Sequence, residues 1–408
     1  MLLLLNFKNF LIRKSMRVDK TKWQKTTIAE IGKIITGATP PTKITAYYNS
    51  ADVCFFKPGD LGNTSITCLD SSVDYISNLG YENSRKLPIG TVLVTCIGII
   101  GKVGITSVLS TCNQQINAII CNENFHNRFI AYNILYNKDY FASKANGPVV
   151  PLINKTTFSQ FVLNVPISIE EQLNIAKELD AIQAMIDGYK AQIMDLDELI
   201  ESIFNKTFGD ISINDMNWEI TSMGKLGNFK NGLNYEKGEK GKVLKFIGVG
   251  DFQNNKYLSS SSILSTIELE SISEEYLLKD EDIVFVRSNG NKNLVGRCLE
   301  VFPNGIEVTY SGFCIRFRKT ANIINKYLLS VLTDSSFKKT HILKSNGIGI
   351  QNINQKLLSN LPIPIPPIEL QKKFESQVDS INTQKALLWE QLKDAEQLMA
   401  ERMQYYFS

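Results

Sequence analysis

Polar side chains in each half of the sequence have the chemistry to hydrogen-bond to DNA base edges and phosphates. Asparagine and glutamine can pair bidentately with adenine, and arginine and lysine with guanine, while glycines let the backbone approach a phosphate. In the first half we predict DNA contacts from Lys57, Asn63, Lys102, Asn113, Gln114, Gln115 and Asn117. In the second half we predict them from Arg287, Asn289, Asn291, Lys292, Arg297, Tyr310 and Ser311. Each loop alone could be a simple turn, and recurrence at matching places favours binding.

The sequence does not indicate catalytic or metal-binding chemistry. His126 and His341 are the only histidines, and neither is near a cysteine or an acidic cluster, so neither a zinc site nor a histidine-based triad is expected. Segment 98–103 lacks the spacing and the hydroxyl residue of a P-loop. No Asn-Pro-Pro-aromatic tetrapeptide and no glycine-rich cofactor turn occurs. We therefore expect a non-enzyme with no catalytic residue, no metal and no cofactor.

The cysteines and the N-terminus bear on the compartment. The 7 cysteines are odd in number, never form a Cys-x-x-Cys pair and mostly lie in apolar runs, which predicts buried thiols in a reducing cytoplasm. The apolar run Met1 to Leu5 is too short to span a membrane, so no membrane partner is expected. We interpret the N-terminus as a flexible extension over residues 1–19, with Met16 as an alternative start.

Two long segments have a helical pattern and must position the two halves. Residues 169–208 and 368–408 each carry an apolar stripe in steps of three and four. Six stripe positions of the first segment coincide with the second at an offset of 199: Leu179, Ile182, Tyr189, Ile193, Leu196 and Ile200 correspond to Val378, Ile381, Leu388, Leu392, Ala395 and Met399. A helix of about 40 residues would be roughly 60 Å long. Such a narrow stripe needs a partner, which favours an antiparallel coiled coil over two unrelated core helices. Gly188 could kink the first helix.

Charge is unevenly distributed along the chain. Of a total formal charge of +3, segment 169–208 holds nine acids against three lysines, and segment 368–408 holds seven acids against five bases. The rest of the chain is therefore basic, as expected of surfaces that meet phosphates.

The rest of the chain also repeats. Trp23 with Ile28, Ile31 and Gly32 matches Trp218 with Met223, Leu226 and Gly227, and segments 56–61 and 87–94 match 247–252 and 278–285. Strands are predicted over 92–97, 116–121, 283–287 and 313–317, and short helices over 128–136 and 326–333. The pattern indicates a tandem duplication with an α+β fold, in which two similar mixed α/β domains are joined by the paired helices about a pseudo-two-fold axis. The predicted boundaries are 20–165 and 210–365 for the domains and 166–209 and 366–408 for the helices.

In this order these motifs resemble the DNA-specificity subunit of type I restriction-modification systems. The resemblance rests on the repeated tryptophan segment, Leu-Pro-x-Gly at 87–90, Gly-Lys-Val-Gly at 101–104, Ser-Gly-Phe at 311–313 and the proline-rich helix entry with Gln371. The first copy departs from the pattern, with Pro166-Ile167-Ser168 at its helix entry and Gln114-Gln115 in place of Ser-Gly-Phe.

The resemblance implies separate roles for the domains, the helices and the partner subunits. Each block would be a target recognition domain that reads one half of a split, asymmetric site in double-stranded DNA. The helices would be spacers to which two methyltransferase subunits dock, and restriction and translocation subunits would join that complex. This chain would supply neither S-adenosylmethionine binding nor cleavage.

Two other interpretations remain open. One is a DNA-binding or scaffolding coiled-coil protein without restriction partners, and a more distant one is a single-chain methyltransferase. A neighbouring reading frame with Asn-Pro-Pro-Tyr would favour the restriction-modification interpretation.

Overall fold

The computed structural model describes residues 18–147, 150–235, 240–253, 257–259, 264–343 and 352–408. Residues 1–17, most of the expected N-terminal extension, lie outside the described residues, as does the side chain of Lys292. The chain divides into two compact units. Unit 1 is Met1–Gln192 with Leu388–Ser408, and unit 2 is Ile193–Leu387.

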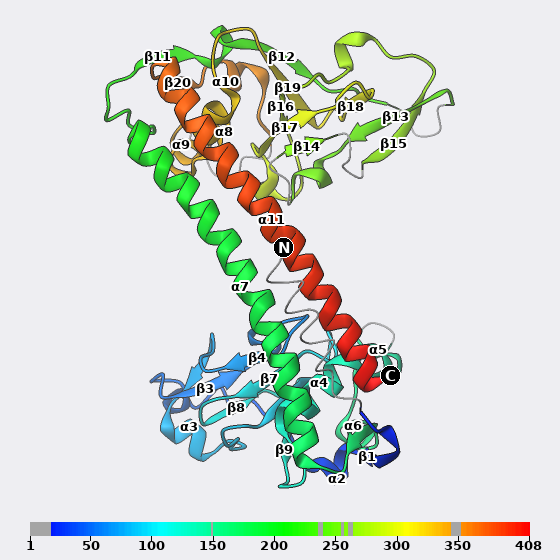
Figure 1. Ribbon diagram of the computed structural model, residues 1–408. Helices are drawn as coiled ribbons and strands as arrows, with labels where there is room; N and C mark the ends of the chain where they lie inside the picture. The colour runs from blue at the N-terminus through cyan, green and yellow to red at the C-terminus, as the bar shows by residue number, and fades with distance from the viewer. Residues whose placement is uncertain (1–17, 148–149, 236–239, 254–256, 260–263, 344–351) are drawn as a thin grey trace. The chain divides into compact units, whose positions relative to one another are not determined.

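Unit 1 contains a five-stranded and a three-stranded sheet and a separate strand pair (Figure 1). The five-stranded sheet has the order β2 (Gly32–Thr36), β9 (Ile116–Cys121), β6 (Val92–Thr95), β7 (Val103–Thr106) and β4 (Thr67–Leu69). The small sheet has the order β5 (Tyr75–Ile76), β3 (Val53–Phe56) and β8 (Ser110–Cys112). β1 (Trp23–Thr27) pairs antiparallel with β10 (Val162–Pro166). All neighbours are antiparallel except β4 with β7 and β3 with β8.

Unit 2 repeats this topology strand for strand. Its five-stranded sheet has the order β12 (Gly227–Asn231), β19 (Cys314–Lys319), β16 (Asp282–Val286), β17 (Cys298–Phe302) and β14 (Tyr257–Ser259). Its small sheet has the order β15 (Ser265–Leu269), β13 (Lys242–Ile247) and β18 (Val308–Tyr310), and β11 (Glu219–Ser222) pairs with β20 (Pro362–Ile365). The two parallel pairs, β14 with β17 and β13 with β18, fall at the same places as in unit 1. The predicted duplication with a mixed α/β fold is confirmed.

Short helices connect the strands in both units. Unit 1 has η1 (Lys20–Lys22), α2 (Ile28–Ile31), η2 (Thr45–Tyr47), η3 (Pro58–Asp60), α3 (Asn78–Glu82), α4 (Asn127–Tyr136), α5 (Lys138–Ser143) and α6 (Lys155–Ser159). Unit 2 has η4 (Met223–Lys225), η5 (Val249–Phe252), η6 (Glu274–Tyr276), η7 (Lys292–Leu294), α8 (Asn325–Thr333), α9 (Ser335–Phe337), η8 (Lys338–Leu343) and α10 (Gln355–Ser359). The predicted short helices 128–136 and 326–333 correspond to α4 and α8.

Each five-stranded sheet lies between two cores because its central strand is apolar on both faces. In β6, Val92 and Val94 belong to a core shared with α4 and the long helices, whereas Leu93 packs toward the small sheet. In β16, Ile283 and Phe285 face the helical core and Val284 faces the small sheet. Because both faces are covered, the central strands are continuous apolar runs rather than alternating ones.

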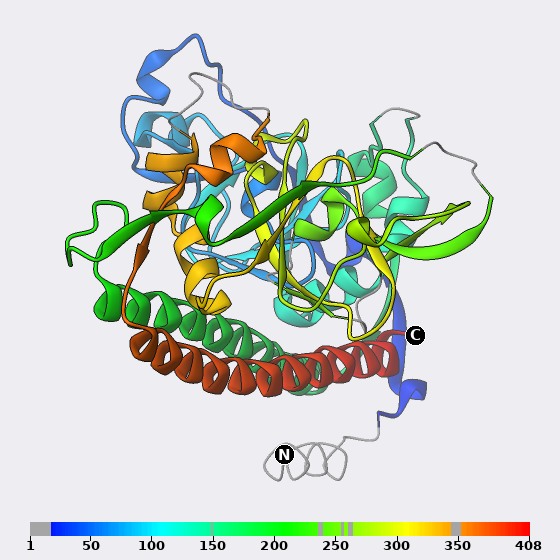
Figure 2. The ribbon, with the colours of Figure 1, turned by 90° about the horizontal axis from the view of Figure 1, so that it is seen from above.

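The two long helices are α7 (Ile169–Phe208) and α11 (Ile368–Phe407), which lie within the predicted helical segments. They run side by side within each unit (Figure 2). In unit 1, Lys190 pairs with Glu396 and Glu178 pairs with Arg402. In unit 2, Asp197 pairs with Lys385 and Phe204 contacts Phe374. In each unit residue numbers rise along one helix as they fall along the other, which confirms the antiparallel pairing.

Two details bear on the sequence predictions. α7 continues through Gly188 as one helix, and a Cβ there would meet no atom within 4 Å. Five of the cysteines are buried, Cys121 is half-buried and Cys68 is exposed, so the prediction of buried thiols was wrong for Cys68. Cys68 is the middle residue of β4, at the edge of its sheet, and points outward there because side chains alternate along a strand. Among the described residues, no helix is both long and apolar enough to cross a membrane.

Candidate nucleic-acid interface

The predicted DNA contacts of unit 1 lie mainly in two loops that are joined by backbone hydrogen bonds. These are the β6–β7 loop (96–102) and the β8–β9 loop (113–115). The N–H of Cys96 donates to the carbonyl oxygen of Gln115 at 2.8 Å, and the N–H of Asn113 donates to that of Phe56 at 3.0 Å. The N–H of Ile153 donates to the carbonyl oxygen of Cys96 at 2.8 Å. The two loops are therefore held against each other and against the end of β3.

Unit 2 makes the same bonds between its β16–β17 loop (287–297) and its β18–β19 loop (311–313). Here the N–H of Arg287 donates to Phe313 at 2.7 Å, that of Ser311 to Ile247 at 3.0 Å, and that of Ile353 to Arg287 at 2.8 Å. Matching these bonds with those of unit 1 makes Cys96 equivalent to Arg287, Asn113 to Ser311 and Gln115 to Phe313. Gln114 and Gln115 therefore replace Gly312 and Phe313 in a loop that has the same backbone hydrogen bonds. We call this shared set of backbone hydrogen bonds the loop frame.

The predicted contact residues of unit 1 divide by exposure. Gln114 and Asn63 are exposed, and Lys57, Lys102 and Gln115 are half-buried. Asn113 is 5% exposed and Asn117 2%.

The two buried asparagines use their polar atoms inside the fold. The Nδ2 of Asn113 donates to the Gln115 side chain at 2.9 Å, and Asn117 accepts a bond from the Thr36 hydroxyl at 2.6 Å. Burial therefore indicates that Asn113 and Asn117 support the loops from inside rather than contact a ligand.

The two predicted lysines of unit 1 both bind neighbouring segments of the fold. The Nζ of Lys102 donates to the carbonyl oxygen of Pro58 at 3.0 Å, and Lys57 forms an ion pair with Asp74 at 2.8 Å. In unit 2 the matching bond comes from Arg297, whose Nη1 donates to the carbonyl oxygen of Gln253 at 2.9 Å, just after η5. These cations connect neighbouring loops and neutralise no buried acid.

In unit 2 the predicted contacts surround Arg287. Arg287 and Asn289 are half-buried and Asn291 is exposed. Successive side-chain to backbone bonds shape this loop, from Asn291 N–H to Asn289 Oδ1 at 2.7 Å and from Asn293 N–H to Asn291 Oδ1 at 3.1 Å. These are Asx-turn contacts, which order a loop without a helix or strand.

Tyr310 and Ser311 are buried. Tyr310 is fully covered and its hydroxyl donates to the carbonyl oxygen of Lys230 at 3.3 Å, while burial raises the pKa of the Tyr310 phenol. Ser311 is 6% exposed, and its Oγ accepts the N–H of Phe313 at 3.2 Å. Like Asn113 and Asn117, these two side chains hold the loop in place.

Phe313 is not among the contacts predicted from the sequence, although it belongs to the Ser-Gly-Phe segment. The structure leaves the Phe313 side chain 63% exposed at the tip of the β18–β19 loop. The Ser-Gly-Phe motif is the feature of the sequence that points to this residue, but the motif does not predict that the phenylalanine side chain is exposed.

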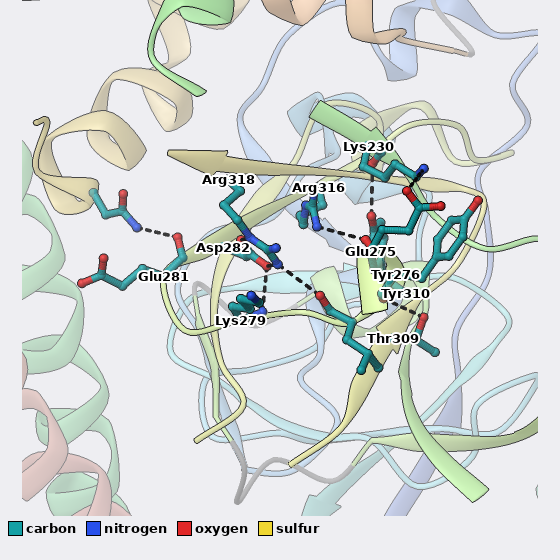
Figure 3. Close-up of polar contacts among 12 residues, drawn as sticks. Lys230, Glu275, Tyr276, Lys279, Glu281, Asp282, Thr309, Tyr310, Arg316 and Arg318 are labelled. Atoms are coloured by element: carbon teal, nitrogen blue, oxygen red, sulfur yellow. Dashed lines mark hydrogen bonds and ion pairs between the residues drawn. The ribbon is translucent and has the colours of Figure 1, made fainter. Parts of the chain in front are cut away.

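A polar network fixes the segment that precedes β16 in unit 2 (Figure 3). Asp282 is 1% exposed and accepts two bonds from Arg318, at 2.7 and 2.6 Å. Hydrogen bonding by Asp282 raises the pKa of the Arg318 guanidinium. Arg318 also donates to the carbonyl oxygen of Leu277, and Arg316 to that of Glu275, both at 3.1 Å. The network therefore ties the start of β16 and the end of β19 to the segment 275–279.

Each globular part is fixed to its long helix by an equivalent glutamine. Gln172 is fully buried, donates to the carbonyl oxygen of Pro166 at 2.9 Å and accepts the N–H of His126 at 2.8 Å. Gln371 repeats both bonds, with Pro366 at 2.8 Å and Ile324 at 3.1 Å. The helix entry that carried the sequence repeat is therefore a tether between helix and domain.

Ion pairs at equivalent positions add a second tether. In unit 1, Arg128 on α4 pairs with Asp180 on α7. In unit 2, Lys326 on α8 pairs with Asp379 at the equivalent position on α11. Among the described residues, no three histidine, cysteine, aspartate or glutamate side chains come together as metal ligands.

The comparisons with known proteins agree with this architecture. The family described as Type I restriction modification DNA specificity domain matches residues 20–196 and again residues 216–394. The MjaIX type I restriction enzyme specificity subunit of Methanocaldococcus jannaschii is 23% identical over 400 residues, covering 90% of this chain and 89% of that protein. The StySPI specificity subunit of Salmonella potsdam is 25% identical over 263 residues, which cover 60% of this chain and only 55% of that protein.

A solved structure shows the same fold. The type I restriction-modification S subunit from M. genitalium superposes with a TM-score of 0.55 at 14% identity, covering 96% of this chain and 97% of that chain. The two family matches together span most of the chain. The chain therefore belongs to the type I restriction-modification DNA specificity family, and it carries two copies of the family's domain.

Proposed function

We propose that this chain is the non-catalytic DNA-recognition subunit of a type I restriction-modification complex. One domain reads each half of a bipartite, asymmetric site in double-stranded DNA. The helices α7 and α11 dock two methyltransferase subunits, and restriction and translocation subunits join through that complex.

One observation carries the proposal: two copies of the same loop frame present different side chains. The half-buried Gln115 of unit 1 stands where the exposed Phe313 stands in unit 2, and the buried Cys96 stands where the half-buried Arg287 stands, on the same backbone bonds. A fixed frame with exchanged side chains supports two readers of different sequences, because base identity is read by side chains in a groove while the backbone sets their position.

Exposed apolar side chains on the long helices support the docking of partner proteins. Met194 on α7 is 63% exposed and Trp389 on α11 is 56% exposed. Trp389 is the candidate anchor for a partner, because tryptophan is enriched among the residues that dominate binding energy at protein interfaces.

Exchanging one domain tests the assignment of half-sites. Residues 20–165 are replaced by the corresponding block of a related specificity subunit, and methylated motifs are mapped by sequencing in cells that carry the partner subunits. One half of the motif should change and the other half should remain. Replacing residues 210–365 is the matched control and should change the opposite half. If either exchange altered both halves, the domains would not be independent readers.

Assembly is tested by co-expression with the methyltransferase and size measurement. We expect two methyltransferase subunits per chain. Trp389→Ala should weaken that complex, whereas Tyr257→Ala, which removes a similarly exposed aromatic on β14, should not. A chain that binds a specific DNA motif but never associates with a methyltransferase would instead be a DNA-binding scaffold without restriction partners.

A further inference from the structure

The β18–β19 loop of unit 2 holds a phenylalanine in solvent. Phe313 is 63% exposed, whereas every other phenylalanine in the described part of the chain is buried or half-buried. A single exposed apolar residue is ordinary on a flexible surface, but this ring is on a loop fixed from both sides.

The backbone around Phe313 has little freedom. Its N–H donates to Ser311 Oγ at 3.2 Å, and its carbonyl oxygen accepts the N–H of Arg287 at 2.7 Å. A Cβ at Gly312 would lie 1.9 Å from the Oδ1 of Asn234, so glycine lets the Asn234 side chain lie against this loop. The N–H of Gly312 donates to the carbonyl oxygen of Leu233 at 2.8 Å. The ring is therefore presented at a defined position.

The neighbours of Phe313 are those of a nucleic-acid surface rather than of an apolar docking face. The nearest loop carries Arg287, whose Nη1 lies 3.5 Å from the carbonyl oxygen of Gly312, followed by the half-buried Asn289 and the exposed Asn291. A guanidinium and amides beside a ring suit base edges and phosphates, with the ring left for apolar contact.

The equivalent position in unit 1 is Gln115, which has the same backbone bond to the β6–β7 loop. A glutamine there can hydrogen-bond to adenine, whereas a phenylalanine can contact a thymine methyl group or press against a base step. Two domains that read different half-sites need different side chains at equivalent positions, and Gln115 and Phe313 differ in this way.

From these observations we infer that Phe313 contacts bases directly in the half-site read by unit 2, and so determines specificity there. This inference rests on the proposed function. The ring makes an apolar contact with the bases while Arg287 supplies the polar contact beside it.

The test uses the full chain and a library of random DNA duplexes, from which bound sequences are selected and read. The wild-type chain should select a two-part motif. Phe313→Ala should lose preference at one or two adjacent positions in one half and bind the selected duplex roughly 5- to 100-fold more weakly, the range for losing one base contact. Ile306→Ala, an exposed apolar residue before β18 and thus at the other end of that strand, is the matched control and should select the wild-type motif.

A second variant keeps the test sharp if the alanine variant folds poorly. Phe313→Gln installs the unit 1 side chain and should shift the preferred base rather than abolish the preference. Two DNA probes then distinguish the form of the contact. If the ring contacts a thymine methyl group, replacing that thymine by uracil should weaken binding of the wild-type chain as much as Phe313→Ala does. If the ring separates a base step, the fluorescence of 2-aminopurine placed at that step should rise when the wild-type chain binds and should not rise when the Phe313→Ala variant binds.

Two results overturn the inference by itself. Phe313→Ala could select the wild-type motif with wild-type affinity, or it could select normally and fail only to assemble with the methyltransferase, which would place the ring at a protein interface. A wild-type chain that selects no motif would overturn the proposed function and the inference together.

Discussion

Glu178→Ala should loosen the contact between α7 and α11 in unit 1 much more than removal of an exposed acid from the same helix pair. Glu178 and Arg402 have side chains only 13% and 14% exposed, and their atoms are 2.5 Å apart. The Tyr406 hydroxyl donates to the second Glu178 oxygen at 2.7 Å. Without Glu178 the guanidinium would remain largely buried with no carboxylate partner, keeping only its hydrogen bond to the Tyr406 hydroxyl and its contacts with the Tyr405 and Tyr406 rings.

The expected cost follows from that burial. Removing one partner of a buried ion pair costs about 3 to 5 kcal/mol. Lys190 and Glu396 connect the same two helices but are 49% and 52% exposed, and a pair exposed to that degree contributes about 0 to 1 kcal/mol. Glu396→Ala is therefore the matched control.

Hydrogen exchange followed by mass spectrometry measures the effect locally, because peptides from 172–192 and 395–408 report on this part of the helix pair. About 3 kcal/mol corresponds to exchange more than roughly 100-fold faster at the most protected amides, against less than about 5-fold for Glu396→Ala. The double variant Glu178→Leu with Arg402→Met should recover most of the protection, since an apolar pair leaves no charge unpaired. Equal effects of Glu178→Ala and Glu396→Ala would refute the reasoning.

Four further outcomes are expected. Gly188→Ala should stabilise the chain against thermal unfolding by about 1 kcal/mol, because alanine is the better helix former and its Cβ meets no atom within 4 Å; a lower unfolding temperature would contradict this. Burial raises the pKa of the Glu300 carboxyl above its ordinary 4.5, so the stability it contributes when protonated is lost as pH rises through the raised pKa. Glu300→Gln should therefore gain stability over the wild type in urea unfolding as pH increases above about 4.5, and a constant difference from pH 4 to 8 would count against it. Arg287→Ala should cost roughly 1 to 3 kcal/mol in binding the unit 2 half-site if the contact is to a base, whereas a phosphate contact would weaken all sequences evenly and lower the salt slope. Four helix-forming residues inserted after Lys206 lengthen α7 by about 6 Å, so the gap between methylated half-sites should grow by one or at most two base pairs at about 3.4 Å per base step. The insertion also turns the second domain by about 40° beyond one helical turn, close to the roughly 34 to 36° of one base step, which favours a change of one. An active variant with an unchanged gap would show that the helix does not set the spacing.

The sequence by itself determined the features that depend on local periodicity. The stripe from Ile169 onward predicted α7, because apolar residues three and four apart lie on one face whatever the rest of the chain does. The run from Ile116 predicted β9 to the residue, and the offset between the copies predicted a second domain of the same topology. The offset of 199 between the two helical segments also makes Gln172 equivalent to Gln371, but it does not predict what either side chain binds.

Only the tertiary structure decided which predicted contacts face outward. Asn117 and Tyr310 have the chemistry of a binding residue, yet both are buried, because strands distant in sequence cover them. The equivalence of Gln115 with Phe313 depends on backbone bonds to Cys96 and Arg287, which lie 19 and 26 residues away along the chain. Side-chain type is a local property, but exposure and loop alignment are set by non-local strand pairing, and for that reason the exposed ring of Phe313 became visible only in the folded chain.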